Sequence, residues 1–146
     1  MKRRIFAMLL SLAMLFTLAP TAFAADSESQ PTEGTCGATG NENSVKWALT
    51  QNNDDSAAPT YTLTISGSGD MANLNNSTEI ENISDGAGTY PWAKLKDSIT
   101  NIVIGDGVTS IGSKAFIAYT NVTSVSIGKD VSEIGVGALS QLSACT

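Results

Sequence analysis

The chain contains no histidine and only two cysteines among its 146 residues. Without histidine there is no Ser-His or Cys-His pair to activate a nucleophile, and the commonest metal ligand is missing. Two cysteines are also too few for a four-cysteine zinc site. The composition therefore speaks against the usual hydrolase and zinc-protein classes, and we predict a protein without catalytic activity, metal or cofactor.

The two cysteines, Cys36 and Cys145, stand near opposite ends of the sequence. An intramolecular disulfide would need their Cα atoms within about 7 Å of each other. We expect no such bond, since the repeat architecture described below separates them. A free or intermolecular thiol and simple burial both stay open.

Basic residues are also scarce, at eight Lys and Arg against fourteen Asp and Glu. Three of the eight are Lys2, Arg3 and Arg4, so a chain without its first residues keeps five and carries a net charge of −9. Nucleic-acid-binding proteins need a basic surface, and an acidic domain is repelled by phosphate backbones. We therefore exclude nucleic acid as a partner.

Long apolar runs are missing except for Ile5–Ala19. This run is shorter than the roughly 20 residues that a transmembrane helix needs. It follows a basic start and precedes the small-x-small sequence Ala22–Ala24, which is the pattern of a cleaved secretory signal. We predict cleavage after Ala24, no membrane insertion afterwards, and a secreted or cell-surface location; an uncleaved N-terminal anchor is the alternative.

Carboxylates are plentiful, so a glycosidase-like pair has to be considered. The candidates fall in a predicted loop, where acidic side chains usually serve solubility: Asp70, Glu79, Glu81 and Asp85. An exported hydrolase is therefore the least favoured of the functions that we consider.

What the sequence does have is a repeat. Residues 98–120, the first unit, and residues 121–143, the second unit, align with seven identical positions, among them Ile104/Ile127, Ile111/Ile134 and Gly112/Gly135. A fixed period of 20–29 residues is typical of leucine-rich-repeat solenoids. The alternative is a β-meander whose two hairpins resemble each other by chance, but here the turn glycines recur with the apolar positions.

Each unit begins with alternating β-branched residues, which predicts a short strand with one buried face. A glycine- and aspartate-rich turn follows, because Gly tolerates positive φ and Asp bonds its own backbone. Neighbouring units should bury each other's apolar side chains. We predict this core: Ile99, Ile102, Ile104, Val108, Ile111, Ala115, Phe116, Val122, Val125, Ile127, Val131, Ile134, Ala138 and Leu139.

The pattern V-x-I-x-x-x-V-x-x-I-G-x-x-A-F resembles the BspA-type leucine-rich repeat of bacterial surface proteins. The first unit fits it closely, whereas the second has Leu139 where the family prefers Phe. The cysteine that often follows is replaced by Tyr119 and Leu142. The resemblance implies a parallel-stranded solenoid with an exported binding or adhesion role.

Before the repeats, Val45–Leu49 and Tyr61–Ile65 alternate apolar and polar residues and predict two antiparallel strands. This region also resembles the segment that often precedes BspA-type repeats. Leu63–Gly69 looks like the strand and turn of a degenerate first repeat, with Pro91-Trp92 in the position of Ala115-Phe116. The residues between would then be an inserted loop, which is either a binding loop or a surface loop without function.

The fold class that we predict is mainly β: a short leucine-rich-repeat solenoid of BspA-like, roughly 23-residue repeats preceded by an N-terminal β-hairpin cap. The predicted organisation is a signal peptide (1–24), a disordered leader (25–35), a cap or degenerate first repeat (36–97) with an inserted loop (71–88), and the repeats (98–146), divided into 98–120, 121–143 and the start of a third unit.

The function that we predict is binding of an extracellular protein or glycan, or adhesion, at the cell surface. The outward strand residues would form the binding face: Asn101, Val103, Ser124 and Ser126. The alternative is a structural spacer or assembly module of a larger cell-wall protein, with the rest of that protein beyond Thr146. Self-association through the open C-terminal coil is a further candidate interaction.

Overall fold

The computed structural model describes residues 31–52, 58–73 and 90–145. The predicted signal peptide and residues 74–88 of the predicted inserted loop lie outside these residues. The described chain is mainly β, with one short 3-10 helix. Its elements are β1 (Glu33–Thr35), β2 (Val45–Gln51), β3 (Tyr61–Gly67), β4 (Gly69–Asp70), η1 (Pro91–Leu95), β5 (Ile99–Ile104), β6 (Val108–Ile111), β7 (Ser124–Ile127) and β8 (Glu133–Ile134).

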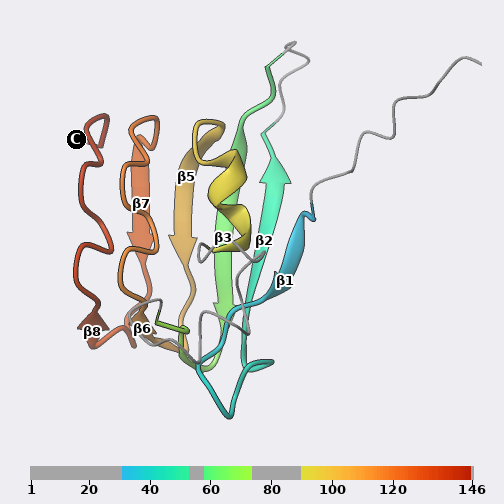
Figure 1. Cartoon of the computed structure of the whole chain (residues 1–146), viewed down its shortest axis with the longest axis vertical. Helices are drawn as coiled ribbons and strands as arrows, with labels where there is room; N and C mark the ends of the chain where they lie inside the picture. Colours follow the sequence, from blue (N-terminus) through green and yellow to red (C-terminus); the bar gives the residue numbers. More distant parts are fainter. Residues whose placement is uncertain (1–30, 53–57, 74–89, 146) are drawn as a thin grey trace, which may run out of the picture.

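Five strands form the larger sheet, in the order β1-β2-β3-β5-β7. Figure 1 shows them side by side, with β1 at one edge and β7 toward the other. The predicted antiparallel strands are confirmed as β2 and β3, which pair from Val45↔Gly67 to Gln51↔Tyr61. From β3 onward the pairing is parallel. The sheet therefore changes from antiparallel to parallel pairing where the repeats begin.

The prediction of a disordered leader is wrong for its last residues. Glu33–Thr35 form β1, which pairs antiparallel with β2. The Leu49 amide also donates to the Thr32 carbonyl at 2.6 Å. The polar composition of this segment does not prevent strand formation, because β2 offers an open edge of main-chain donors and acceptors.

The second sheet has the order β4-β6-β8, and both of its pairings are parallel. Residues 23 positions apart face each other across neighbouring strands, as in Ile104↔Ile127 and Ile111↔Ile134. Main-chain bonds follow the same offset: the Thr123 amide donates to the Thr100 carbonyl at 2.9 Å. The 23-residue period of the sequence is therefore the number of residues that separates a strand position from its partner on the neighbouring parallel strand.

The segment before the first unit takes part in the same arrangement. Leu63 of β3 lies beside Ile102, and Gly69 of β4 lies beside Val108. Trp92 of η1 stacks on Phe116, with ring centroids 6.2 Å apart and planes 27° apart. Its indole N–H donates to the Ala115 carbonyl at 3.4 Å. Trp92 thus occupies, one unit earlier, the position that Phe116 occupies in the first unit.

A row of aromatic rings forms the centre of the core. Trp47 lies 5.6 Å from Trp92, Tyr90 stacks on Trp92 at 4.8 Å, and Phe116 meets Tyr119 edge-on at 6.0 Å. All five side chains are buried. Such contacts each contribute about 0.5–1.5 kcal/mol beyond their buried area, so this row binds η1, the β2–β3 pair and the first unit together.

The predicted core is right for the first unit and partly wrong for the second. Ile104 and Ile111 are 2 % and 1 % exposed, whereas their identical counterparts Ile127 and Ile134 are 42 % and 50 % exposed. Val125, Val131 and Leu139 are half-buried. The difference is one of position: the first unit has a neighbour on both sides, and no described segment covers the outer side of the second.

The glycines that recur in the repeat are needed more because neighbouring main chain packs close to them than because of their own turn conformation. In the turn Gly105–Gly107 only Gly107 has a positive φ, of 93°. A Cβ on Gly112 would lie 2.1 Å from both the Ala72 carbonyl oxygen and the Tyr90 hydroxyl. Gly112 therefore lets the preceding segment pack directly against the first unit.

We predict that Gly112→Ala lowers the free energy of unfolding by about 3 kcal/mol, because the overpacked methyl group must displace main chain. Gly137→Ala is the control. At Gly137 an added Cβ meets no atom closer than 3.7 Å, and only the φ of 69° disfavours a side chain. The cost there should therefore be about 1 kcal/mol. Urea unfolding measures both variants, and an equal cost at the two sites would contradict the close-approach argument.

The turns of the two units are joined by a reciprocal pair of hydrogen bonds. The Asp106 carboxylate accepts from the Lys129 amide at 3.0 Å, and the Asp130 carboxylate accepts from the Gly107 amide at 3.0 Å. The Lys129 ammonium reaches both carboxylates, at 3.1 and 3.3 Å. These aspartates, predicted to shape single turns, thus also connect one unit to the next.

These bonds lower the pKa of Asp106 below its ordinary value of 3.8, chiefly because the Lys129 amide donates to the carboxylate. The side-chain bond to Asp106 raises the pKa of Lys129. A depressed carboxyl pKa means that the ionised form stabilises the folded state above pH 3.8. That contribution is lost as the pH falls through the folded-state pKa.

We predict that Asp106→Ala lowers the melting temperature at neutral pH, and that the difference from wild type shrinks below the ordinary aspartate pKa of 3.8 and disappears once the pH is below the lowered folded-state pKa. The matched control is Asp97→Ala, since Asp97 pairs with its own neighbour Lys96 at 2.8 Å and joins no second unit through its carboxylate. Thermal unfolding followed by circular dichroism from neutral to acidic pH provides the test. A difference that persists unchanged at low pH would contradict the role of the charge.

Candidate binding face

The structure brings the four predicted site residues together on two adjacent strands. Asn101 of β5 lies beside Ser124 of β7, and Val103 lies beside Ser126. Asn101 and Val103 are half-buried, and both serines are exposed. Alternate residues of these strands point into the core, so the four side chains share the side of the sheet that faces away from it.

The same face continues over strands that the sequence analysis left out. On β3, Thr62 lies beside Asn101 and Thr64 beside Val103. Further along, Ala48 of β2 pairs with Thr64. We call this surface the outward face; its residues are Glu33, Thr35, Lys46, Ala48, Thr50, Thr62, Thr64, Ser66, Asn101, Val103, Ser124 and Ser126. The alternation of apolar and polar residues within Tyr61–Ile65 already indicated that Thr62 and Thr64 point away from the core.

One end of the outward face is fixed by a hydrogen-bond network around Asn52. The Asn52 amide nitrogen donates to the Thr60 hydroxyl at 2.9 Å and to the Thr100 hydroxyl at 3.0 Å. Its amide oxygen accepts from Thr62 at 2.8 Å. Asn101 joins through bonds of 3.2 Å to Thr100 and 3.4 Å to Thr62. Asn101 is therefore held in place by its own protein, unlike the two serines of β7.

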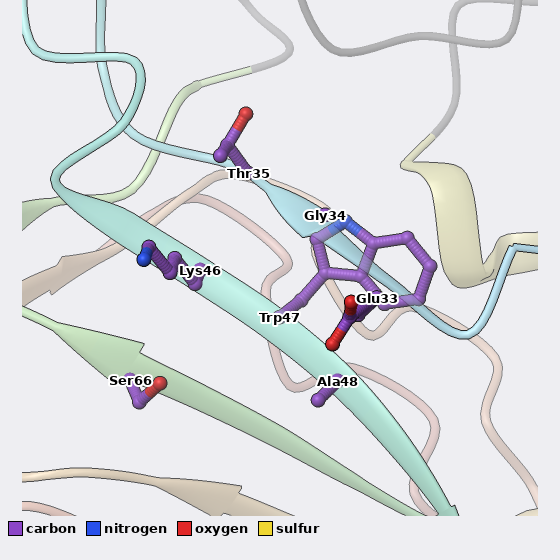
Figure 2. Close-up of a pocket in the computed structure, with 7 residues that line it drawn as sticks. All are labelled: Glu33, Gly34, Thr35, Lys46, Trp47, Ala48 and Ser66. Carbon is purple, nitrogen blue, oxygen red and sulfur yellow. The ribbon is translucent and has the colours of Figure 1, made fainter.

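A shallow hollow of about 430 Å³ lies at the other end of the sheet, over β1, β2 and β3. Figure 2 shows the seven residues around it, which come from these three strands. They are Glu33, Gly34, Thr35, Lys46, Trp47, Ala48 and Ser66. A Cβ on Gly34 would lie 2.7 Å from the indole nitrogen of Trp47, so the glycine leaves room for the indole edge there.

Of the four candidate carboxylates, Asp70 lies within the described residues. Asp70 lines a small hollow of about 190 Å³ together with Glu133, and it accepts a hydrogen bond from the Thr109 hydroxyl at 2.5 Å. Glu79, Glu81 and Asp85 lie outside the described residues. Within residues 31–52, 58–73 and 90–145, no group of three or more His, Cys, Asp or Glu side chains is placed to hold a metal ion.

The two cysteines are both free thiols. Cys36 is fully buried in the core, and this burial raises the pKa of its thiol to about 12. It therefore stays protonated at neutral pH and packs as a small apolar side chain. Cys145 is exposed at the far end of the described chain.

Comparison with known proteins gives one structural likeness to report. No family model matches the chain, and no curated protein matches it. A solved leucine-rich repeat protein from Eubacterium ventriosum ATCC 27560 is 32 % identical over 76 % of this chain, with a TM-score of 0.49. The match covers 24 % of that protein, so this chain spans about a quarter of its length.

In the part of the chain that the structure describes, the helix is η1, and its five residues are far fewer than a membrane-spanning helix needs.

We predict that Asn52→Leu destabilises the fold by about 1–3 kcal/mol, because three hydrogen bonds between partly buried side chains are lost. Asn101→Leu removes only the two longer bonds of the network and should cost less. Chemical unfolding of both variants gives the comparison. If Asn101→Leu proves the more costly change, Asn52 is not the centre of the network.

Proposed function

We propose that the chain is an exported leucine-rich-repeat protein of the BspA type, which binds a protein or a glycan at the cell surface without catalysis. The observation that carries this proposal is the outward face. It runs over five hydrogen-bonded strands and presents mainly small polar side chains at fixed register positions. A preorganised surface of this kind loses little conformational entropy on binding.

The architecture proposed with this function is a short solenoid. The parallel pairings β3-β5-β7 and β4-β6-β8 at a 23-residue offset support it. The antiparallel strands β1 and β2 would cover its first coil, since such a coil would otherwise expose an apolar side. Export is proposed from the basic, apolar and small-x-small pattern of residues 1–24.

The chemistry of the outward face suits an extended, hydrogen-bonding ligand. In the described part of the chain, Ser124 and Ser126 make no side-chain hydrogen bond, so both hydroxyls are free to donate and accept. Val103 gives an apolar contact between them and Thr64. A sugar ring or a peptide strand combines the same two features, polar groups at its edge and apolar faces.

The alternative function is that of a spacer or assembly module in a larger cell-wall protein. The exposed apolar side of the second unit favours it, because Ile127 and Ile134 are placed to pack against another segment. The two functions use different surfaces and can be tested separately.

We predict that the double variant Val103→Arg/Ser124→Arg loses binding to an array of glycans and to immobilised extracellular matrix extract. Two long cations on the outward face would obstruct an extended ligand and change the charge of its site. The control is Thr120→Arg/Ser143→Arg, which adds the same charge at exposed turn positions outside the strands. Equal binding by both double variants, at unchanged melting temperature, would exclude the outward face as the binding site.

A further inference from the structure

Exposed apolar side chains gather on the outer side of the second unit. The described chain has four large hydrophobic residues that are at least 40 % exposed, and three of them lie in this unit: Ile127 at 42 %, Ile134 at 50 % and Val136 at 76 %. The fourth, Ile117 at 40 %, belongs to the first unit. We call the outer side of the second unit, with the open edges of β7 and β8, the end face. Clusters of this kind mark interaction surfaces.

The end face also offers main-chain hydrogen bonds. β7 and β8 are the last strands of their sheets. On β5, the Gly105 amide donates to the Ile65 carbonyl of β3, so by alternation Ile102 and Ile104 point their main-chain groups to β7. In the observed register these groups bond to Ser124 and Ser126, so the amides and carbonyls of Val125 and Ile127 point away from β5. They form an open edge next to the apolar side chains.

The opposite end of the structure does not complement this surface. There the edge strand is β1, which has only three residues, and its Glu33 and Thr35 side chains are exposed and polar. A head-to-tail contact would place the apolar end face against that polar edge. A two-fold arrangement instead pairs the end face with itself, and such closed dimers are the commonest symmetric assemblies.

We propose that the end face binds a second copy of this chain through antiparallel pairing of the two β7 strands. The two-fold axis passes near Ser126, so that Val125 lies opposite the partner's Ile127 and the reverse. Because both residues point their main-chain groups to the edge, this register forms four main-chain hydrogen bonds. Ile134 and Val136 pack beside the axis, out of water.

The proposal continues an interface that the structure already contains. Ile104 and Ile111 of the first unit are buried by the second unit, which presents Ile127 and Ile134 on its own open side at the same positions. The second copy would cover these two residues as the second unit covers their counterparts. Pairing β7 with its symmetry mate also extends the sheet and removes its exposed edge.

The first test is the oligomeric state of the purified chain, measured by sedimentation velocity over a range of concentrations. We expect a monomer–dimer equilibrium. Ile134→Glu/Val136→Glu should raise the dimer dissociation constant by about a hundredfold, because unpaired carboxylates would be buried. Ile117→Glu is the control, since it places the same charge on an exposed isoleucine of the first unit, and it should leave the dimer intact.

The second test addresses the register. Across a non-hydrogen-bonded antiparallel pair the Cα atoms are about 4.5 Å apart, within the range for a disulfide. In a Cys145→Ser background, which removes the exposed native thiol, Ser126→Cys should form a covalent dimer on mild oxidation. Ser66→Cys, an exposed site inside the sheet on β3, should not.

Three results would overturn the proposal. They are a monomer at all concentrations for the wild-type chain, a dimer that resists Ile134→Glu/Val136→Glu, and cross-linking through Ser66→Cys as efficient as through Ser126→Cys. Circular dichroism of each variant confirms that it is folded before its mass is interpreted.

Discussion

The structure depends on the fact that no single unit buries its own apolar side chains. A 23-residue unit forms one short strand in each sheet, so its isoleucines and valines face the neighbouring unit across a parallel pairing. Each unit therefore gains stability from its neighbours in the way of a one-dimensional array. Before the first unit, the row of aromatic rings replaces a neighbouring unit, since Trp92 packs on Phe116. The β2–β3 pair and η1 thus act as neighbours of the first unit although their sequences differ from it.

Stability must then be uneven along the chain. The first unit is enclosed by β3, β4 and η1 on one side and by the second unit on the other. The second unit has its apolar residues covered on one side only, with Ile134 half exposed. Local opening requires less free energy where fewer apolar contacts are broken, so the second unit should open first. Covering its end face would remove this difference between the two units, whose apolar positions correspond.

The sequence predicted what is local or periodic. The register of Ile104 with Ile127 and the strand at Tyr61–Ile65 both follow from spacing, and the structure confirms them. The exposure of Ile127 could not be predicted from its identity with Ile104, because exposure depends on what lies next to a residue. The bond from Asn52 to Thr100 spans 48 positions. No periodic pattern links them, since only the approach of β3 to β5 brings them together.

The outward face and the end face both include β7, and binding at one does not block binding at the other. The serine side chains of β7 point outward, whereas the main-chain groups of Val125 and Ile127 point to the edge, so one strand can bind a ligand and a second copy together. A two-fold axis along the sheet normal reverses β7 and keeps both outward faces on the same side. The proposed dimer would therefore present two binding faces in one plane. A ligand with repeated groups would then bind with an effective concentration set by a rigid spacing, and weak contacts at single serines would suffice for firm attachment.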